Sequence, residues 1–246
     1  MIEAKSRTFA ELVGFDPSRL GASADEMHGT TVLSLRYDGG VLTLADRRAT
    51  AGNLIMFDNA EKVFALDDHT VIAISGAFAR SLEVCRFLKH SFKYYRRMTL
   101  NELSLDGKLQ EITRTISGNM AMAMQGIGVF IPIIAAYDKS NDTFGVYFFD
   151  GAGASFQTGS YACAGSGSER IRGVFEYIAR EKGPWEKRPL KDVLIEALRM
   201  LDIAADLDSA TGGFRKIMPV ARILDREGNR VVADADLAKA IKVAIS

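Results

Sequence analysis

Four polar segments contain side chains that could act together in catalysis, although each also has an ordinary structural interpretation. Asp46 follows the strand-like run VLTLA and precedes two arginines, and Lys62 begins the apolar run KVFAL. Ser166 lies in the small-residue turn AGSGSER, and Asp208 begins the polar loop DSATGG. A solvent-facing turn, a strand-edge lysine, a helix cap and a turn former would account for them one at a time. Taken singly, therefore, none of the four predicts a site.

Thr30, at the start of the strand-like run TTVLSLRY, is a candidate nucleophile that this chain carries in an inactive form. A threonine hydroxyl needs a base, and an N-terminal threonine brings one in its α-amine, whose pKa is about 7.7–8.0. Internal Thr30 has no such amine, so this chemistry requires a cut after Gly29, where glycine lets the backbone bend. A cationic Lys62 would favour the alkoxide, and Asp46 would offset the cost of burying that lysine.

The composition is that of an ordinary globular protein. The chain has 246 residues, of which 48% are hydrophobic and 25% charged, and its 31 basic and 31 acidic residues balance. This balance argues against nucleic-acid binding, and no apolar run is long enough for a signal peptide or a membrane span. Cys85 and Cys163 lie in apolar contexts without metal-ligand spacing, so we expect buried reduced thiols. We therefore predict a cytoplasmic protein that binds no metal, cofactor, nucleic acid or membrane.

The elements that must position these residues fall into two repeated blocks of strands followed by helices. Residues 1–29 indicate an appendage with one short helical stretch at Phe9–Val13, and the body begins at Thr30. Periodicity predicts strands over 30–37, 40–48, 62–67, 70–76, 129–138, 143–150, 154–159, 160–165 and 216–224. It predicts helices over 77–97, 106–124, 168–180, 190–205 and from 234 onward. This order favours an α+β fold, a four-layer α-β-β-α sandwich of two antiparallel sheets, with 30–246 as one domain.

A methionine stripe in the second predicted helix has two interpretations. Met120 and Met124 continue the apolar positions Leu109, Ile112 and Ile116. Methionine at helical spacing more often fills a core than binds a cofactor, so we expect these side chains to be buried.

The polar segments, taken in order, resemble the proteasome β-subunit family. The shared features are Gly-Thr-Thr-Val at the first strand, Asp-Arg-Arg sixteen residues on, Lys62 a further sixteen on, Gly-Ser-Gly-Ser, and Asp-Ser-Ala-Thr-Gly-Gly. Stretches such as DRRAT, GNLI, AMQG and LDSATGG are most similar to the actinobacterial-type bacterial 20S proteasome β subunit. The similarity covers 30–246 and extends weakly into the segment before it. It implies the N-terminal-nucleophile hydrolase fold and threonine endopeptidase activity, with residues 1–29 as a propeptide removed by self-cleavage between Gly29 and Thr30.

The resemblance also implies a role for particular positions. The catalytic group would comprise Thr30, Asp46, Lys62, Ser166, Asp208 and Ser209, with Arg48 on the same turn as Asp46. Gly76 would supply the oxyanion-hole N–H. Thr211 stands where many family members have serine. Residues matched to the substrate-binding edges and pocket are Ala49, Thr50, Ala60, Phe64, Ile74 and Phe78. Because the pocket residues are uncharged and mostly apolar, we expect cleavage after hydrophobic residues.

Partners follow from the resemblance alone. It implies a homo-heptameric β ring, stacked with itself and with α-subunit rings in a 28-subunit barrel and supplied with unfolded proteins by an ATPase ring. Three alternatives stay open: the simpler bacterial relative that pairs with a hexameric ATPase, an N-terminal-nucleophile amidase for small molecules, and a non-catalytic ring subunit. The first usually lacks the DSATGG segment, and non-catalytic subunits usually lose the threonine or the lysine.

Overall fold

A computed structural model describes residues 29–52, 54–214 and 216–245. The helical stretch predicted at Phe9–Val13 lies outside the described residues. One five-stranded antiparallel sheet has the order β10-β1-β2-β11-β12. Its strands are β1 (Thr31–Tyr37), β2 (Gly40–Ala45), β10 (Tyr161–Gly165), β11 (Val220–Asp225) and β12 (Gly228–Val231). Strands β1 and β2 are buried along almost their whole length, as expected for strands covered on both faces.

A second five-stranded antiparallel sheet has the order β5-β6-β7-β8-β9. Its strands are β5 (Val63–Asp67), β6 (Thr70–Ala73), β7 (Ile133–Asp138), β8 (Thr143–Phe149) and β9 (Ser155–Thr158). A core of small and β-branched residues, including Val32, Val41, Val71 and Ala135, fills the space between the two sheets. The sheets therefore pack face to face.

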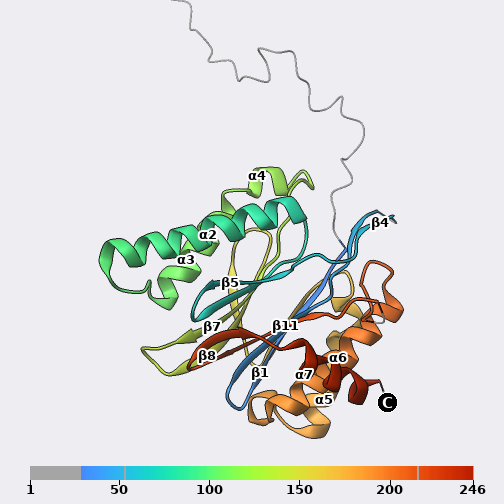
Figure 1. The fold of residues 1–246 in the computed structure, drawn as a ribbon. Coiled ribbons are helices and arrows are strands. Elements are labelled where there is room, and N and C mark those ends of the chain that lie inside the picture. Colours follow the sequence, from blue (N-terminus) through green and yellow to red (C-terminus); the bar gives the residue numbers. More distant parts are fainter. Residues whose placement is uncertain (1–28, 53, 215, 246) are drawn as a thin grey trace, which may run out of the picture.

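Helices cover the two outer faces, as Figure 1 shows. Beside the second sheet lie α2 (Phe78–Thr99), α3 (Leu105–Ser117) and the short α4 (Met120–Ala123). Beside the first sheet lie α5 (Ser168–Lys182), η2 (Trp185–Lys187), α6 (Leu190–Leu207) and α7 (Asp234–Ala244). Separate apolar cores join each helical layer to its sheet. The predicted four-layer α-β-β-α sandwich is confirmed.

Several local predictions were wrong. The helix expected over 106–124 ends at Ser117, and a new short helix begins after Gly118 and Asn119. Met120 and Met124 are 40% and 83% exposed, so they do not fill the core. The strand-to-strand link after Asp46 contains an unpredicted hairpin of β3 (Ala49–Ala51) and β4 (Leu54–Phe57), and β12 was also missed. These strands have only three or four residues, which is too short for a periodic signal.

The two cysteines are free and differ in burial. Cys85 is buried and Cys163 is half-buried, so the expectation of buried thiols holds fully only for Cys85. Burial raises the pKa of the Cys85 thiol to about 12 and that of Cys163 to about 11. In the described part of the chain, no helix is long and apolar enough to cross a membrane. Nor do the described residues include a group of three or more His, Cys, Asp or Glu side chains that could hold a metal ion.

Candidate active site

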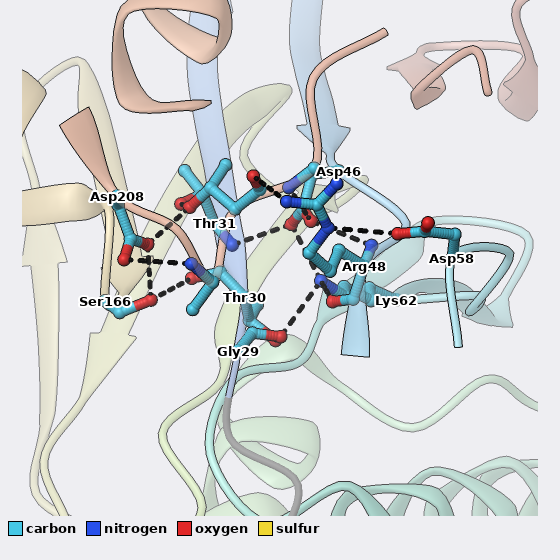
Figure 2. Close-up of polar contacts among 12 residues, drawn as sticks. Gly29, Thr30, Thr31, Asp46, Arg48, Asp58, Lys62, Ser166 and Asp208 are labelled. Atoms are coloured by element: carbon cyan, nitrogen blue, oxygen red, sulfur yellow. Dashed lines mark hydrogen bonds and ion pairs between the residues drawn. The ribbon is translucent and has the colours of Figure 1, made fainter. Parts of the chain in front are cut away.

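The candidate nucleophile lies at the entry to the central strand β1. Thr30 is 2% exposed, and its hydroxyl donates a hydrogen bond to the carbonyl oxygen of Gly29 at 2.5 Å. The Gly29–Thr30 peptide bond is intact, and Figure 2 shows the hydroxyl beside it. The hydroxyl therefore lies next to the carbonyl that a self-cleavage reaction would attack.

Lys62 immediately precedes β5 and reaches the same carbonyl from the other sheet. Its ammonium donates to Asp46 Oδ1 at 2.7 Å, to the Arg48 carbonyl at 2.5 Å and to the Gly29 carbonyl at 3.2 Å (Figure 2). Both side chains of the Lys62–Asp46 pair are fully buried. Burial lowers the pKa of Lys62 below its ordinary value, and the Asp46 carboxylate opposes this shift only in part. The neutral form of the Lys62 amine is thus populated at a lower pH than that of an exposed lysine.

Asp46 follows β2, and its carboxylate is bound by backbone as well as by Lys62. Backbone N–H groups donate to it from Thr31 at 2.8 Å, Arg48 at 2.9 Å and Gly212 at 2.8 Å. These donors compensate the desolvation of a carboxylate that is 1% exposed. The ordinary interpretation of Asp46 as part of a solvent-facing turn is therefore wrong.

Arg48 holds the C-terminal loop against this turn. Its Nε donates to Asp58 Oδ1 at 3.0 Å, while Nη1 donates to the carbonyls of Ser209 at 3.1 Å and Thr211 at 3.3 Å. Asp58 follows β4 at the far end of the unpredicted hairpin. The arginine thus fixes both ends of the hairpin and the loop after α6 in one arrangement.

A second network of hydroxyls surrounds Asp208. Oδ2 of Asp208 accepts hydrogen bonds from Ser166 Oγ and Thr211 Oγ1, both at 2.6 Å. Thr31 Oγ1 lies 2.6 Å from Thr211 Oγ1, and Ser166 Oγ is 3.4 Å from the Thr30 carbonyl oxygen. Because Thr211 has one hydroxyl proton and gives it to the carboxylate, Thr31 is the donor of the remaining bond. The network therefore runs from Thr31 to Asp208 and ends beside Thr30.

Thr211, and not Ser209, supplies the loop hydroxyl that binds Asp208. Ser209 is exposed, and its backbone carbonyl, rather than its hydroxyl, accepts a hydrogen bond from Arg48. Thr211 is fully buried. The sequence carries a signal for this assignment, since Thr211 stands where many members of the resembling family have serine, whereas nothing in the pattern points to Thr31.

The predicted oxyanion donor Gly76 lies between β6 and α2. Its φ of +95° is one that side-chain-bearing residues rarely adopt, and an added Cβ would lie 2.2 Å from the Val129 carbonyl oxygen. Gly76 and Phe130 form an isolated antiparallel β-bridge. Its two hydrogen bonds run from the Ala77 N–H to the Val129 carbonyl and from the Ile131 N–H to the Ser75 carbonyl. Among the described residues this leaves the Gly76 N–H without a protein acceptor.

The predicted substrate-binding residues divide into two groups. Ile74 is buried in the core beneath α2, and half-buried Phe64 and Phe78 pack against that core. Ala49, Thr50 and Ala60 are buried at the two ends of the β3–β4 hairpin. The Ile74 N–H donates to the Lys62 carbonyl at 2.9 Å, which ties the apolar group to the site. A separate small crevice beside Asp46 is lined by Asp46, Arg47, Arg48, Asp58, Gly212, Gly213, Lys216, Ile217 and Pro219.

This arrangement, two facing sheets between helices with a threonine at the first strand, belongs to the class of N-terminal-nucleophile hydrolase sandwiches. Comparison with known proteins narrows the class. The pattern of the family described as "Proteasome subunit" matches residues 26–214. The chain belongs to the proteasome subunit family.

Similar proteins named "Proteasome subunit beta" occur in several bacteria. The one from Jonesia denitrificans is 35% identical over 216 residues, which cover 87% of this chain and 70% of the relative. That of Acidothermus cellulolyticus is 36% identical over 221 residues, 87% of this chain and 74% of the relative. That of Acidimicrobium ferrooxidans is 36% identical over 244 residues, 93% and 85% of the two chains. The resemblance to actinobacterial-type β subunits is thereby confirmed.

Proposed function

We propose that this chain is the catalytic β subunit of a bacterial 20S proteasome, a threonine endopeptidase that activates itself by cutting after Gly29. The observation that carries the proposal is the shared acceptor of Thr30 and Lys62. The candidate nucleophile and a fully buried amine both contact the carbonyl oxygen of the intact Gly29–Thr30 bond. A structural subunit would have no need to bury this pair at that bond.

In the self-cleavage step, neutral Lys62 takes the proton of the Thr30 hydroxyl as Oγ1 attacks the Gly29 carbonyl carbon. The resulting ammonium donates to the oxyanion that forms on the Gly29 oxygen, and Asp46 holds it in place. The Gly29–Thr30 C–N bond then breaks, and the leaving nitrogen takes its proton from the Lys62 ammonium, which becomes neutral again. Residue 29 is left esterified to Thr30 Oγ1. Water hydrolyses this ester, releasing residues 1–29 with a free carboxylate and leaving Thr30 with a free α-amine.

In the mature subunit, the new α-amine is the base for peptide substrates. Ser166 and Asp208 lie beside Thr30 and provide the polar surroundings that orient the amine. The substrate forms an acyl-enzyme on Thr30, and the Gly76 N–H stabilises its oxyanion, a role worth about 2.7–4 kcal/mol in comparable sites. The apolar group of Ile74, Phe64 and Phe78 favours cleavage after hydrophobic residues.

Exposed apolar segments support the proposed assembly. All four residues of β4, Leu54 to Phe57, are 46–64% exposed, and Met120, Met122, Met124 and Ile127 are 40–83% exposed. Surfaces of this kind are normally covered by a partner. They fit a cytoplasmic barrel of heptameric β rings capped by α-subunit rings and supplied with unfolded chains by an ATPase ring.

The test is Thr30→Ala in the full-length chain, produced alone and together with α-type proteasome subunits. Intact mass and peptidase assays should show a folded protein that keeps residues 1–29 and cleaves no peptide. Thr143→Ala, which removes an exposed threonine of β8, is the matched control and should mature as the unaltered chain does. Maturation or peptidase activity in Thr30→Ala would show that Thr30 is not the nucleophile.

A further inference from the structure

The peptide unit at the cut is confined from two sides by groups outside the catalytic set. A Cβ atom built on Gly29 would lie 2.2 Å from Thr50 Oγ1 and 3.0 Å from Thr50 Cβ. It would also lie 2.8 Å from the carbonyl oxygen of Ala210. Since real Cβ atoms do not approach other atoms this closely, no side chain fits at position 29 without movement.

We propose, on the basis of the self-cleavage proposed above, that Thr50 and the Ala210 carbonyl restrict the residue before the nucleophile to glycine. In this view Thr50 determines the specificity of self-cleavage by excluding volume. Its role at this step is distinct from any contact that it makes with a peptide substrate.

Strand β3 places the Thr50 side chain against Gly29, and the irregularity of the β3–β4 pairing lies on the opposite strand. Ala49 and Thr50 are both buried, at 2% and 4% exposure. The register of β3 against β4 shifts between these two residues. Ala49 pairs with Phe57 and Thr50 with Ile55, so the extra residue, Met56, lies on β4, while Thr50 keeps its place in β3 against Gly29.

The Ala210 side of the confinement is rigid. The Ala210 N–H donates to Asp208 Oδ1 at 3.2 Å, and the Thr211 N–H donates to the Asp208 carbonyl at 3.0 Å. Arg48 holds the carbonyls on either side of Ala210, those of Ser209 and Thr211. The loop cannot retreat without breaking these bonds. The Thr50 side chain is therefore the part of the wall that a substitution can remove.

A side chain at position 29 would act on the reaction through the position of the scissile carbonyl. Relief of the clash requires the Gly29 peptide unit to move, and that movement separates its oxygen from Thr30 Oγ1 and Lys62 Nζ. A displacement of about 1 Å in such a geometry lowers a rate about 100-fold. We therefore expect Gly29→Ala to slow self-cleavage by about that factor.

The experiment measures the loss of residues 1–29 by intact mass, in full-length chains, under conditions where the unaltered chain matures. Gly29→Ala is introduced into four backgrounds: unaltered, Thr50→Gly, Thr50→Ala and Thr50→Val. Each is compared with the same background carrying Gly29. In Thr50→Val, which keeps the volume of threonine, we expect Gly29→Ala to slow self-cleavage by about 100-fold, as in the unaltered background. In Thr50→Gly the same substitution should slow it by less than about 10-fold. Thr50→Ala retains only the Cβ atom, so the slowing caused by Gly29→Ala should be intermediate in this background. It provides a second test without the added backbone freedom of glycine at position 50.

Three results would overturn the inference while leaving self-cleavage intact. The first is that Gly29→Ala slows self-cleavage equally in the Thr50→Gly and unaltered backgrounds. The second is that Thr50→Val relieves this slowing as much as Thr50→Gly does. The third is that Gly29→Ala matures at the rate of the unaltered chain. An unaltered chain that never loses residues 1–29, even with α-type subunits, would instead refute the proposed function and the inference with it. Thermal unfolding of each variant shows whether a lost rate reflects a lost fold.

Discussion

Among the described residues, two lysine–aspartate pairs have a buried lysine, and they lie at opposite ends of β5. Lys62 and Asp46 lie 2.7 Å apart beside Thr30, and Lys108 and Asp67 lie 2.7 Å apart between α3 and β5. By residue type and by distance the two pairs are equivalent. Their surroundings differ, and the difference separates a pair that can do chemistry from one that fastens elements together.

The Lys62 pair is fully buried, and each donor position of its ammonium points to a separate acceptor, one of which is the Gly29 carbonyl. Lys108 is 5% exposed but its partner Asp67 keeps 19% of its side-chain surface exposed. The Lys108 ammonium also donates to Thr70 Oγ1 at 3.1 Å and lies over the Phe92 ring. These contacts join α3 to the β5–β6 hairpin and contain no reactive bond. Complete burial and contact with the Gly29 carbonyl, rather than the ion pair itself, distinguish the lysine that we propose to be catalytic.

The sharpest way to break this comparison is to replace each lysine by methionine. Lys62→Met should reduce self-cleavage and peptidase activity at least about 10³-fold, because the proton acceptor and oxyanion donor are lost together. Lys108→Met should retain activity within about twofold, since it touches no reacting group. Intact mass and peptide hydrolysis measure both. Equal losses in the two variants would show that the pairs do not differ in function.

The pH dependence of self-cleavage sharpens the comparison further. Burial lowers the pKa of Lys62 from the ordinary value of 10.5, so its neutral form becomes populated at a lower pH than in a free lysine. The rate should rise about tenfold per pH unit below this lowered pKa and level off above it, with the midpoint below 10.5. Lys62→Arg, which stays protonated, should show no such rise. Time courses of intact mass from pH 6 upward provide the measurement, and a midpoint at or above 10.5 would contradict the assigned role.

The structural role of the second pair predicts an effect on stability. Lys108→Met leaves Asp67 with a lost partner, and breaking a fully buried pair costs about 3–5 kcal/mol. Because Asp67 is partly exposed, we expect a smaller loss of about 2 kcal/mol in the free energy of unfolding. Urea unfolding is measured in the Thr30→Ala background, which is expected not to mature, so that processing does not complicate the comparison of the variants. An unchanged midpoint would mean that the pair does not fasten α3.

The sequence predicted the layers of the fold and the residues that meet around Lys62. It did not predict the shape of the loop around Asp208. Long periodic segments such as α2, α5 and α6 appear close to their predicted bounds because each buries a continuous apolar face. Asp46 and Lys62 were found through spacing and resemblance. The β3–β4 hairpin and its register shift were missed, because strands of three and four residues are too short to give a periodic signal.

The smallest effect concerns Ser209 and Thr211, which the sequence alone could not rank. Thr211→Val keeps the shape of the side chain but removes its hydrogen bond to the Asp208 carboxylate. A hydrogen bond to a charged group contributes about 1.5–3 kcal/mol, so peptidase activity should fall about 10-fold, part of that energy being recovered by rearrangement. Ser209→Ala removes an exposed hydroxyl and should change the rate by less than about twofold.

Thr211→Ser is the matched variant, because it restores the hydroxyl without the methyl group. Recovery of activity in Thr211→Ser, together with a loss in Thr211→Val, would assign the effect to the hydroxyl rather than to packing. If Ser209→Ala were instead the slower enzyme, the loop would have to adopt another arrangement in the assembled particle, with Ser209 turned toward Asp208. The pair of substitutions therefore tests whether the hydroxyl network seen around Thr30 is the one that works on substrates.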